Sequence, residues 1–349
     1  TFAIISHPDA GKTTLTEQIL YKSGVIRELG SVDKGTAYTD DLEVERQRGI
    51  SVKSSEANLK WKGIEINLID TPGHVDFSAE VERSLSVLDG AVLLISAVEG
   101  VQPQTEVYFN ALRAADIPTI IFINKIDRIG ADINRVLGEI NTLLTDSALP
   151  LSVFSKRKAD EPDVEFILSE NHYNSEYMDS LIEALADKDE LLLERYLEDE
   201  HIDYCLLKER LGALTSKCSI YPVIYGSAIN GIGVTHLLDS LIDFIPSAKD
   251  YSDDLLSAVV FKVKRSKSQG KLAYVRLYGG RIQNRDLVHN YTLDVDEKVT
   301  LIKKLIGQKE ADCNEVKSGE IACVSGLTKS GIGDILGAPE RVPKVPSIA

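Results

Sequence analysis

The 349-residue chain contains few cysteines and no long apolar run. Its cysteines lack the close pairing of zinc ligands, so we expect reduced thiols at Cys205, Cys218, Cys313 and Cys323. No apolar stretch approaches the roughly 18 residues that a transmembrane helix needs, and no signal peptide is visible. These absences predict a cytoplasmic protein with no membrane partner and no disulfide or zinc chemistry.

Positive charge is scarce relative to negative charge. The formal net charge is −15, which does not offer the basic surface typical of proteins that bind free DNA. Local clusters of basic residues, such as the one over 262–271, still allow the protein to bind a large RNA-containing partner. The length suffices for two domains with separate cores, and we expect a monomer.

A strand–loop–helix pattern opens the chain. The apolar run Phe2–Ile5 ends in a turn, and a helical pattern follows from Lys12 to Ser23. A Gly-Lys-Thr at this junction is typical of a phosphate-binding loop, whose amides and helix end face the anion. We expect Lys12 to reach the outer phosphates and the Thr13 hydroxyl to bind Mg²⁺; the alternative is a chance match. The predicted nucleotide-binding residues here are Ser6 (in place of the usual first glycine), His7, Pro8, Asp9, Ala10, Gly11, Lys12, Thr13 and Thr14.

The polar stretch Arg27–Arg48 has many charges and no periodicity. It is either a surface loop or a segment that becomes ordered when a ligand binds. Ser51 follows this stretch and offers a second hydroxyl for Mg²⁺, while Gly49 allows close approach of the backbone.

A second motif follows the β run Gly63–Ile69. Asp70 is expected to hold Mg²⁺ through water, and the Gly73 amide to donate to a γ-phosphate. His74 is the candidate catalytic residue because it could position the attacking water. The alternative is an ordinary turn. The predicted site residues of this motif are Asp70, Thr71, Pro72, Gly73 and His74.

Two continuously apolar runs, Gly90–Ala97 and Pro118–Asn124, are separated by a helical pattern and are typical of buried parallel strands. The second run ends in Asn-Lys-Ile-Asp. Asp127 can accept hydrogen bonds from N1–H and the exocyclic amine of guanine, which adenine does not present in that arrangement. The predicted base-binding residues are Asn124, which would also brace the loops, Lys125, whose stem would lie on the base, Ile126, Asp127, and Ser227 and Ala228 after the strand Tyr221–Tyr225. The expected ligands are therefore GTP or GDP with Mg²⁺.

The order of these motifs predicts an α/β phosphate-loop GTPase domain with a mostly parallel sheet and helices on both faces. We expect this domain over 1–247, closed by a helix over Val234–Ile245. It carries an inserted helical subdomain over about 146–219, with a helix over Tyr177–Leu197, that has no chemistry of its own. A linker over 248–255 leads to short strands over 256–341, one of them over Lys298–Ile306, that indicate a small β-barrel. Residues 342–349 look like the start of a linker to further domains, so we expect a fragment of a longer protein.

With these motifs in order, the chain resembles the translational GTPases. The resemblance to the tetracycline-resistance ribosomal protection proteins, relatives of elongation factor G, extends over nearly the whole chain. It is carried by Lys22–Thr36, Glu45–Ile50, Arg83–Ala91 and Leu272–Tyr278. The stretch Ser6–Thr14 is more similar to the GTPase-type peptide-release factor.

The resemblance implies ribosome-stimulated GTP hydrolysis in which His74 orients the water when the ribosome docks. Ser51 stands where the family usually has a threonine that binds Mg²⁺, and Asp9 helps to order the first loop. Ile50 matches one half of an apolar gate around the histidine, while Pro8 replaces the usual valine or isoleucine of the other half. Full-length members carry three further domains, one of which dislodges tetracycline from the ribosome.

Three alternatives stay open on the sequence. The chain could come from an elongation factor G-like or peptide-release-factor GTPase. It could instead belong to a metabolic GTPase, such as a sulfate-activation subunit, that shares the two-domain plan. A non-catalytic GTP-dependent binding module is the third, and His74 argues against it.

Overall fold

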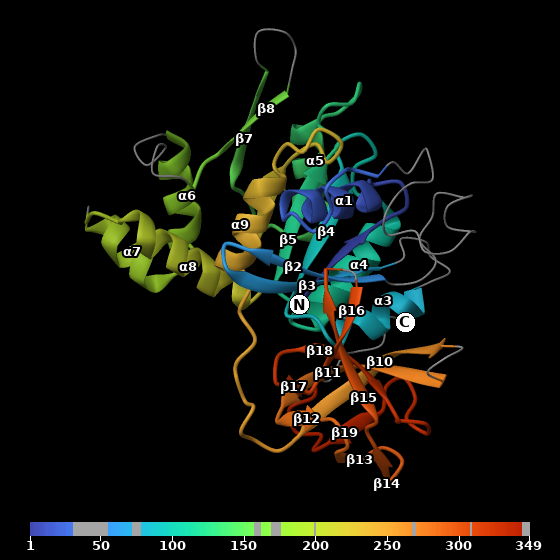
Figure 1. The fold of residues 1–349 in the computed structure, drawn as a ribbon. Helices are drawn as coiled ribbons and strands as arrows, with labels where there is room; N and C mark the ends of the chain where they lie inside the picture. The colour runs from blue at the N-terminus through green and yellow to red at the C-terminus, as the bar shows by residue number, and fades with distance from the viewer. Residues whose placement is uncertain are drawn as a thin grey trace.

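The computed structural model describes residues 1–30, 55–71, 78–156, 162–168, 176–198, 200–266, 270–307 and 309–343. These residues form an α/β domain that carries an inserted helical subdomain, and a β domain below it (Figure 1). This arrangement confirms the predicted architecture. Within these ranges, no helix is both long enough and apolar enough to cross a membrane.

The α/β domain is built on a seven-stranded sheet with the strand order β2-β3-β1-β4-β5-β9-β6, in which only β2 runs antiparallel to its neighbour. Strands β1, β4, β5 and β9 are buried along their whole length, which explains why they are continuous apolar runs. The strands are β1 (Phe2–Ser6), β2 (Ser55–Trp61), β3 (Ile64–Asp70), β4 (Gly90–Ser96), β5 (Thr119–Asn124), β6 (Ala148–Pro150) and β9 (Tyr221–Tyr225).

Helices cover both faces of this sheet. α1 (Lys12–Lys22) and α9 (Val234–Phe244) pack on one face, where Leu15 and Leu238 meet Ile4 of β1. On the other face, Ile5 of the same strand meets residues of α3, α4 and α5, because successive strand side chains point to opposite faces. These helices are α3 (Ser78–Leu85), α4 (Pro103–Ala114) and α5 (Ile133–Glu139), which continues as a π-helical turn over Ile140–Leu144.

The inserted subdomain lies beside the sheet, on the left of Figure 1. It has its own apolar core and consists of β7 (Ser152–Lys156), β8 (Pro162–Phe166), α6 (Glu176–Ala186), α7 (Glu190–Leu197) and α8 (Tyr204–Ser216). The predicted single helix over Tyr177–Leu197 is wrong. α6 ends at Ala186, and the carboxylate of Asp189 then caps α7 by accepting from the Leu192 amide at 3.1 Å.

The predicted insertion also included β6, which no sequence signal had singled out. These three residues form the parallel edge strand of the main sheet, where Leu149 lies opposite Pro222 of β9. The inserted elements therefore follow β6, and α8 leads back into β9, which lies between β5 and β6 in the sheet.

The β domain contains an eight-stranded antiparallel sheet in the order β14-β13-β19-β10-β11-β18-β15-β16, together with the β12–β17 pair, around one apolar core. A single predicted strand over Lys298–Ile306 is wrong, because β14 ends at Lys298 and β15 begins at Leu301. The strands are β10 (Ser257–Ser266), β11 (Gly270–Gly279), β12 (Arg281–Gln283), β13 (Leu287–Asn290), β14 (Val295–Lys298), β15 (Leu301–Ile306), β16 (Lys309–Cys313), β17 (Glu315–Lys317), β18 (Ile321–Ser325) and β19 (Ile335–Gly337).

The two domains share an apolar interface: the core beneath α3 continues into Phe261 and Tyr274 of the β domain. Arg276 of β11 is 1% exposed, and its Nη2 donates to both carboxylate oxygens of Asp89 at 3.0 and 2.9 Å. Close to it, the Tyr278 hydroxyl donates to the Ser86 carbonyl. This interface holds the β domain against the end of α3 and the start of β4.

Candidate functional site

The carboxyl ends of β1, β3, β5 and β9 lie at one rim of the sheet, since these strands are parallel. The first loop, which follows β1, turns sharply into α1 at Gly11, whose φ is +96°. A Cβ at Gly11 would lie 2.4 Å from Nδ2 of Asn124, so only glycine lets the first loop approach β5 this closely.

Lys12 and Asp70 form a buried ion pair beneath this turn: the Lys12 ammonium donates to Oδ1 of Asp70, and the two side chains are 7% and 2% exposed. Oδ2 of Asp70 is also buried and has no hydrogen-bond partner in the described part of the chain. A buried carboxylate oxygen without a donor is costly, so this atom is suited to a metal-bound water or another ligand donor.

Asn124 joins three loops. Its Nδ2 donates to the Ala10 carbonyl at 2.8 Å, and its Oδ1 accepts from the Ala228 amide at 2.8 Å. The side chain is 2% exposed, so both bonds are made away from water. Asn124 thus fixes the first loop and the loop after β9 to the carboxyl end of β5.

The remaining residues of the Asn-Lys-Ile-Asp motif point in different directions. Ile126 is buried in the core, whereas Lys125 has a left-handed backbone with φ +64° and places its ammonium 3.2 Å from Glu99. Asp127 lines an open pocket of about 520 Å³ beside Lys125 and Arg128. Of the four, Asp127 is therefore the acidic side chain that lines an open pocket.

Ser227 and Ala228 are buried at the start of the loop after β9, but their backbone amides are already used. The Ser227 amide donates to the Ile232 carbonyl at 3.1 Å, and the Ala228 amide donates to Asn124. The Ser227 hydroxyl accepts from Nδ2 of Asn230 at 3.1 Å. A base contact through Ala228 would require this amide to be shared with Asn124.

His7 and Thr71 also have internal roles. His7 is buried, and its Nδ1 lies 2.6 Å from the Pro8 carbonyl, an acceptor that requires the proton on Nδ1. Burial lowers the pKa of His7 below its usual value, although the Pro8 carbonyl and the Glu99 carboxylate oppose that shift. The Thr71 hydroxyl donates to the Ile4 carbonyl at 2.9 Å, so this side chain ties β3 to β1.

Ser51, Pro72, Gly73 and His74 lie outside the described residues. The other predicted residues of the first loop surround its turn: Ser6 and Ala10 are buried, Pro8, Thr13 and Thr14 are half-buried, and Asp9 is exposed with φ +62°.

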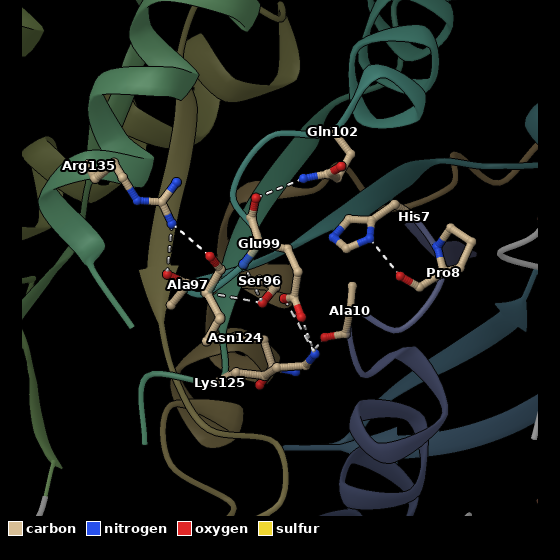
Figure 2. Close-up of polar contacts among 11 residues, drawn as sticks. His7, Pro8, Ala10, Ser96, Ala97, Glu99, Gln102, Asn124, Lys125 and Arg135 are labelled. Atoms are coloured by element: carbon tan, nitrogen blue, oxygen red, sulfur yellow. Dashed lines mark hydrogen bonds and ion pairs between the residues drawn. The ribbon is translucent and has the colours of Figure 1, made fainter. Parts of the chain in front are cut away.

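Sequence reasoning missed Glu99, in the loop after β4. Figure 2 shows its carboxylate next to the Lys125 ammonium, on the side of the site where His7 lies. A glutamate after a strand resembles any solvent-exposed loop residue. The one signal in the sequence was the adjacent glycine, which indicates a turn. In the structure, Gly100 has a φ of +73°.

The family model described as the elongation factor Tu GTP-binding domain matches residues 1–247, and that of elongation factor G domain 2 matches residues 255–338. The chain belongs to the elongation factor Tu GTP-binding domain family. The first match contains the whole α/β domain, and with it the four strand ends at the rim described above.

Curated relatives of this family carry names that refer to tetracycline. The chain is 41% identical to the tetracycline resistance protein TetP of Clostridium perfringens over 346 residues, 99% of this chain and 52% of that protein. It is 41% identical to the oxytetracycline resistance protein of Streptomyces rimosus, covering 97% of this chain and 52% of that protein. For TetM from transposon Tn5251 of Streptococcus pneumoniae the identity is 40%, with 97% and 52% covered. The chain thus spans about half the length of the curated relatives it matches.

A crystal structure of a protein from Thermus thermophilus superposes with a TM-score of 0.86. The two sequences are 26% identical, and the match covers 99% of this chain and 56% of that one. The relative placement of the α/β and β domains is therefore shared with a solved protein.

Proposed function

We propose that this chain binds GTP and GDP with Mg²⁺ at the rim of the α/β domain. Within the full-length protein, it hydrolyses GTP to GDP and phosphate on the ribosome, as part of a cytoplasmic, monomeric ribosomal protection protein that releases tetracycline. The observation that carries this proposal is the pair of buried hydrogen bonds through which Asn124 holds the first loop and the Ala228 loop together. These bonds hold the two loops side by side, where one ligand can touch both.

The residues present fit a magnesium ion. Thr13 and Ser51 would offer hydroxyl oxygens, and Asp70 would act through water, for which its unpartnered Oδ2 is suited. Held there, Mg²⁺ would supply positive charge to offset the negative charge that develops during phosphoryl transfer. Lys12, now paired with Asp70, is the buried cation available to an incoming phosphate oxygen.

Guanine recognition is assigned to Asp127. Its carboxylate is open to the pocket beside Lys125, and guanine presents two donors to it. Losing a buried hydrogen-bond partner typically costs about 1–3 kcal/mol, which is enough to reject adenine by roughly one to two orders of magnitude. Lys125 would cover one face of the base with its stem.

A translational role is favoured over a metabolic one by the β domain. Residues 255–338 match domain 2 of elongation factor G, and the relatives that match the whole chain are named for tetracycline resistance. Elongation and release factors share these two domains. We therefore assign tetracycline release to the half of the full-length relatives that this chain does not cover.

Hydrolysis is tested with His74→Ala in the full-length protein. We expect slow turnover by wild type alone, strong stimulation by ribosomes, and loss of about 10²-fold or more of the stimulated rate in the variant, because a group that orients or deprotonates the nucleophile typically contributes that much. His201→Ala, an exposed change in the inserted subdomain, serves as the control.

The measurement is phosphate release with and without ribosomes, followed by translation assays with tetracycline. Full stimulation in His74→Ala would remove the assigned role of this residue. A fast rate without ribosomes would contradict the proposed dependence on a partner.

A further inference from the structure

The loop after β4 is a built structure rather than a loose connection. Oγ of Ser96 accepts from the amides of Val98 and Glu99 at 3.2 and 3.3 Å, and the Gly100 amide donates to the Ser96 carbonyl at 2.8 Å. Nε2 of Gln102 donates to the Glu99 carbonyl at 2.7 Å. These bonds fix the backbone on both sides of Glu99; Figure 2 shows those made by the Ser96 hydroxyl and by Gln102.

A second layer of support comes from α5. Nη2 of Arg135 donates to the Val98 carbonyl at 2.8 Å, and Oε2 of Glu139 accepts from the Val101 amide at 2.9 Å. A Cβ at Gly100 would lie 2.1 Å from the same Glu139 oxygen, so the loop and α5 are in direct contact. The loop therefore has little freedom to move relative to the helix that follows the base-reading motif.

The Glu99 carboxylate projects from this fixed loop. Its two oxygens lie 3.2 and 3.4 Å from Nζ of Lys125, and the Glu99 and Lys125 side chains are 40% and 22% exposed. Lys125 has φ +64°, a conformation that costs a side-chain-bearing residue about 1–2 kcal/mol. This turn directs the Lys125 side chain across the end of β5 toward the β4 loop, and Glu99 holds its tip there.

We propose that Glu99 is a positioning residue that controls how long the guanine nucleotide stays bound. It acts by holding the Lys125 ammonium, so that the aliphatic stem of Lys125 stays in the orientation that covers the base. This inference rests on the proposed guanine-nucleotide site. Without Glu99, the lysine side chain gains rotamer freedom that must be lost again each time a nucleotide binds.

An exposed ion pair alone contributes little, typically about 0.2–1 kcal/mol. Here the carboxylate stands on a backbone fixed from both sides, so less entropy is lost when the pair forms. The effect of Glu99 on nucleotide binding must therefore depend on the presence of Lys125.

A double-mutant cycle tests this in the full chain, with Glu99→Gln, Lys125→Met and the combination. Calorimetry with GDP and Mg²⁺ gives the affinity, and the release rate of a fluorescent GDP analogue gives the retention. We expect Glu99→Gln to weaken GDP binding and accelerate release by roughly fivefold to tenfold in the wild-type background. In the Lys125→Met background, we expect it to change either value by less than about twofold.

Glu106→Gln in the first turn of α4 is the matched control, with the same change of charge on the neighbouring element. Glu99→Asp is the second variant, expected to restore part of the retention because it keeps the charge at shorter reach. Thermal unfolding confirms that each variant folds.

Failure of wild type to bind GDP would overturn the proposed nucleotide site itself. Wild-type affinity in Glu99→Gln would overturn the role of Glu99 while leaving that site in place. An equal loss with and without Lys125 would also overturn it, because Glu99 would then act through the loop and not through the lysine.

Discussion

Gly11 shows how one residue fixes the geometry of the first loop. Its positive φ and its contact distance to Asn124 are separate constraints, and both exclude a side chain. Gly24 at the end of the α1 region has φ +77° but open space around its Cβ position, so it has the first constraint without the second.

We therefore predict different outcomes for Gly11→Ala and Gly24→Ala. Both should lose about 1 kcal/mol or more of unfolding free energy from backbone strain. Only Gly11→Ala should also weaken GDP binding, by at least roughly tenfold, because Asn124 must move and its two bonds to the loops are lost. Urea unfolding and calorimetry check the pair. Equal GDP affinity in the two variants would show that the Gly11–Asn124 contact does not shape the site.

Asp189 connects two helices of the inserted subdomain, α7 and α8. Oδ1 of Asp189 caps α7, and Oδ2 accepts from Nε and Nη2 of Arg210 in α8 at 2.8 and 2.5 Å. Burial by itself raises the pKa of this carboxyl, but the hydrogen bonds from Arg210 and from the α7 amides outweigh burial and hold the pKa below its usual value.

This shift sets a direction for the pH dependence. In the folded state, Asp189 binds a proton less readily than it does in the unfolded chain. Its contribution to the unfolding free energy is therefore fully present above about pH 4 and is lost as the pH falls through the folded-state pKa. Asp189→Asn keeps a capping oxygen but loses the charge, and should lower the unfolding free energy by about 1–3 kcal/mol at pH 7.

The difference between wild type and Asp189→Asn should shrink below about pH 4. Asp203→Asn is the control, because Asp203 caps α8 in the same way by accepting from the Leu206 amide at 2.8 Å. Urea titrations over a pH series check both. A difference that grows as the pH falls would contradict the account of Asp189.

Elements with a strong local signal were predictable, and elements defined by distant partners were not. The strand Tyr221–Tyr225 was predicted with its observed bounds, and α1 and α9 to within one residue at the C-terminal end, since apolar periodicity, glycines and short turns mark them. β6 was missed because three ordinary residues become a strand only by pairing with β9. At the rim, Lys12 and Asn124 were singled out from the sequence, and their role in ligand binding stays a prediction. Glu99 was not singled out, because its partner Lys125 is distant in sequence.

On the scale of the whole molecule, Arg276 ties the β domain to the α/β domain. The pair with Asp89 is largely buried, and breaking a buried pair by removing one partner typically costs about 3–5 kcal/mol. We predict that Arg276→Met loosens the interface and speeds proteolysis of the linker near residues 246–256.

Arg281→Met is the comparison, because Arg281 pairs with Asp253 at the surface and should contribute less than about 1 kcal/mol. Limited proteolysis and calorimetric unfolding distinguish the two variants. Equal resistance to protease would show that the shared apolar core, not the Arg276 pair, holds the domains together.

The proposed function depends most on the identity of the ligand at the rim. Calorimetric titration of the chain with GDP and with ADP, each with Mg²⁺, tests it most directly, and Asp127→Asn extends the test to xanthosine diphosphate. We predict that GDP binds roughly tenfold to a hundredfold more tightly than ADP. In the variant we predict a shift of preference from GDP to xanthosine diphosphate, because the amide replaces an acceptor with a donor. Equal binding of GDP and ADP, or unchanged GDP affinity in Asp127→Asn, would contradict the guanine-nucleotide site.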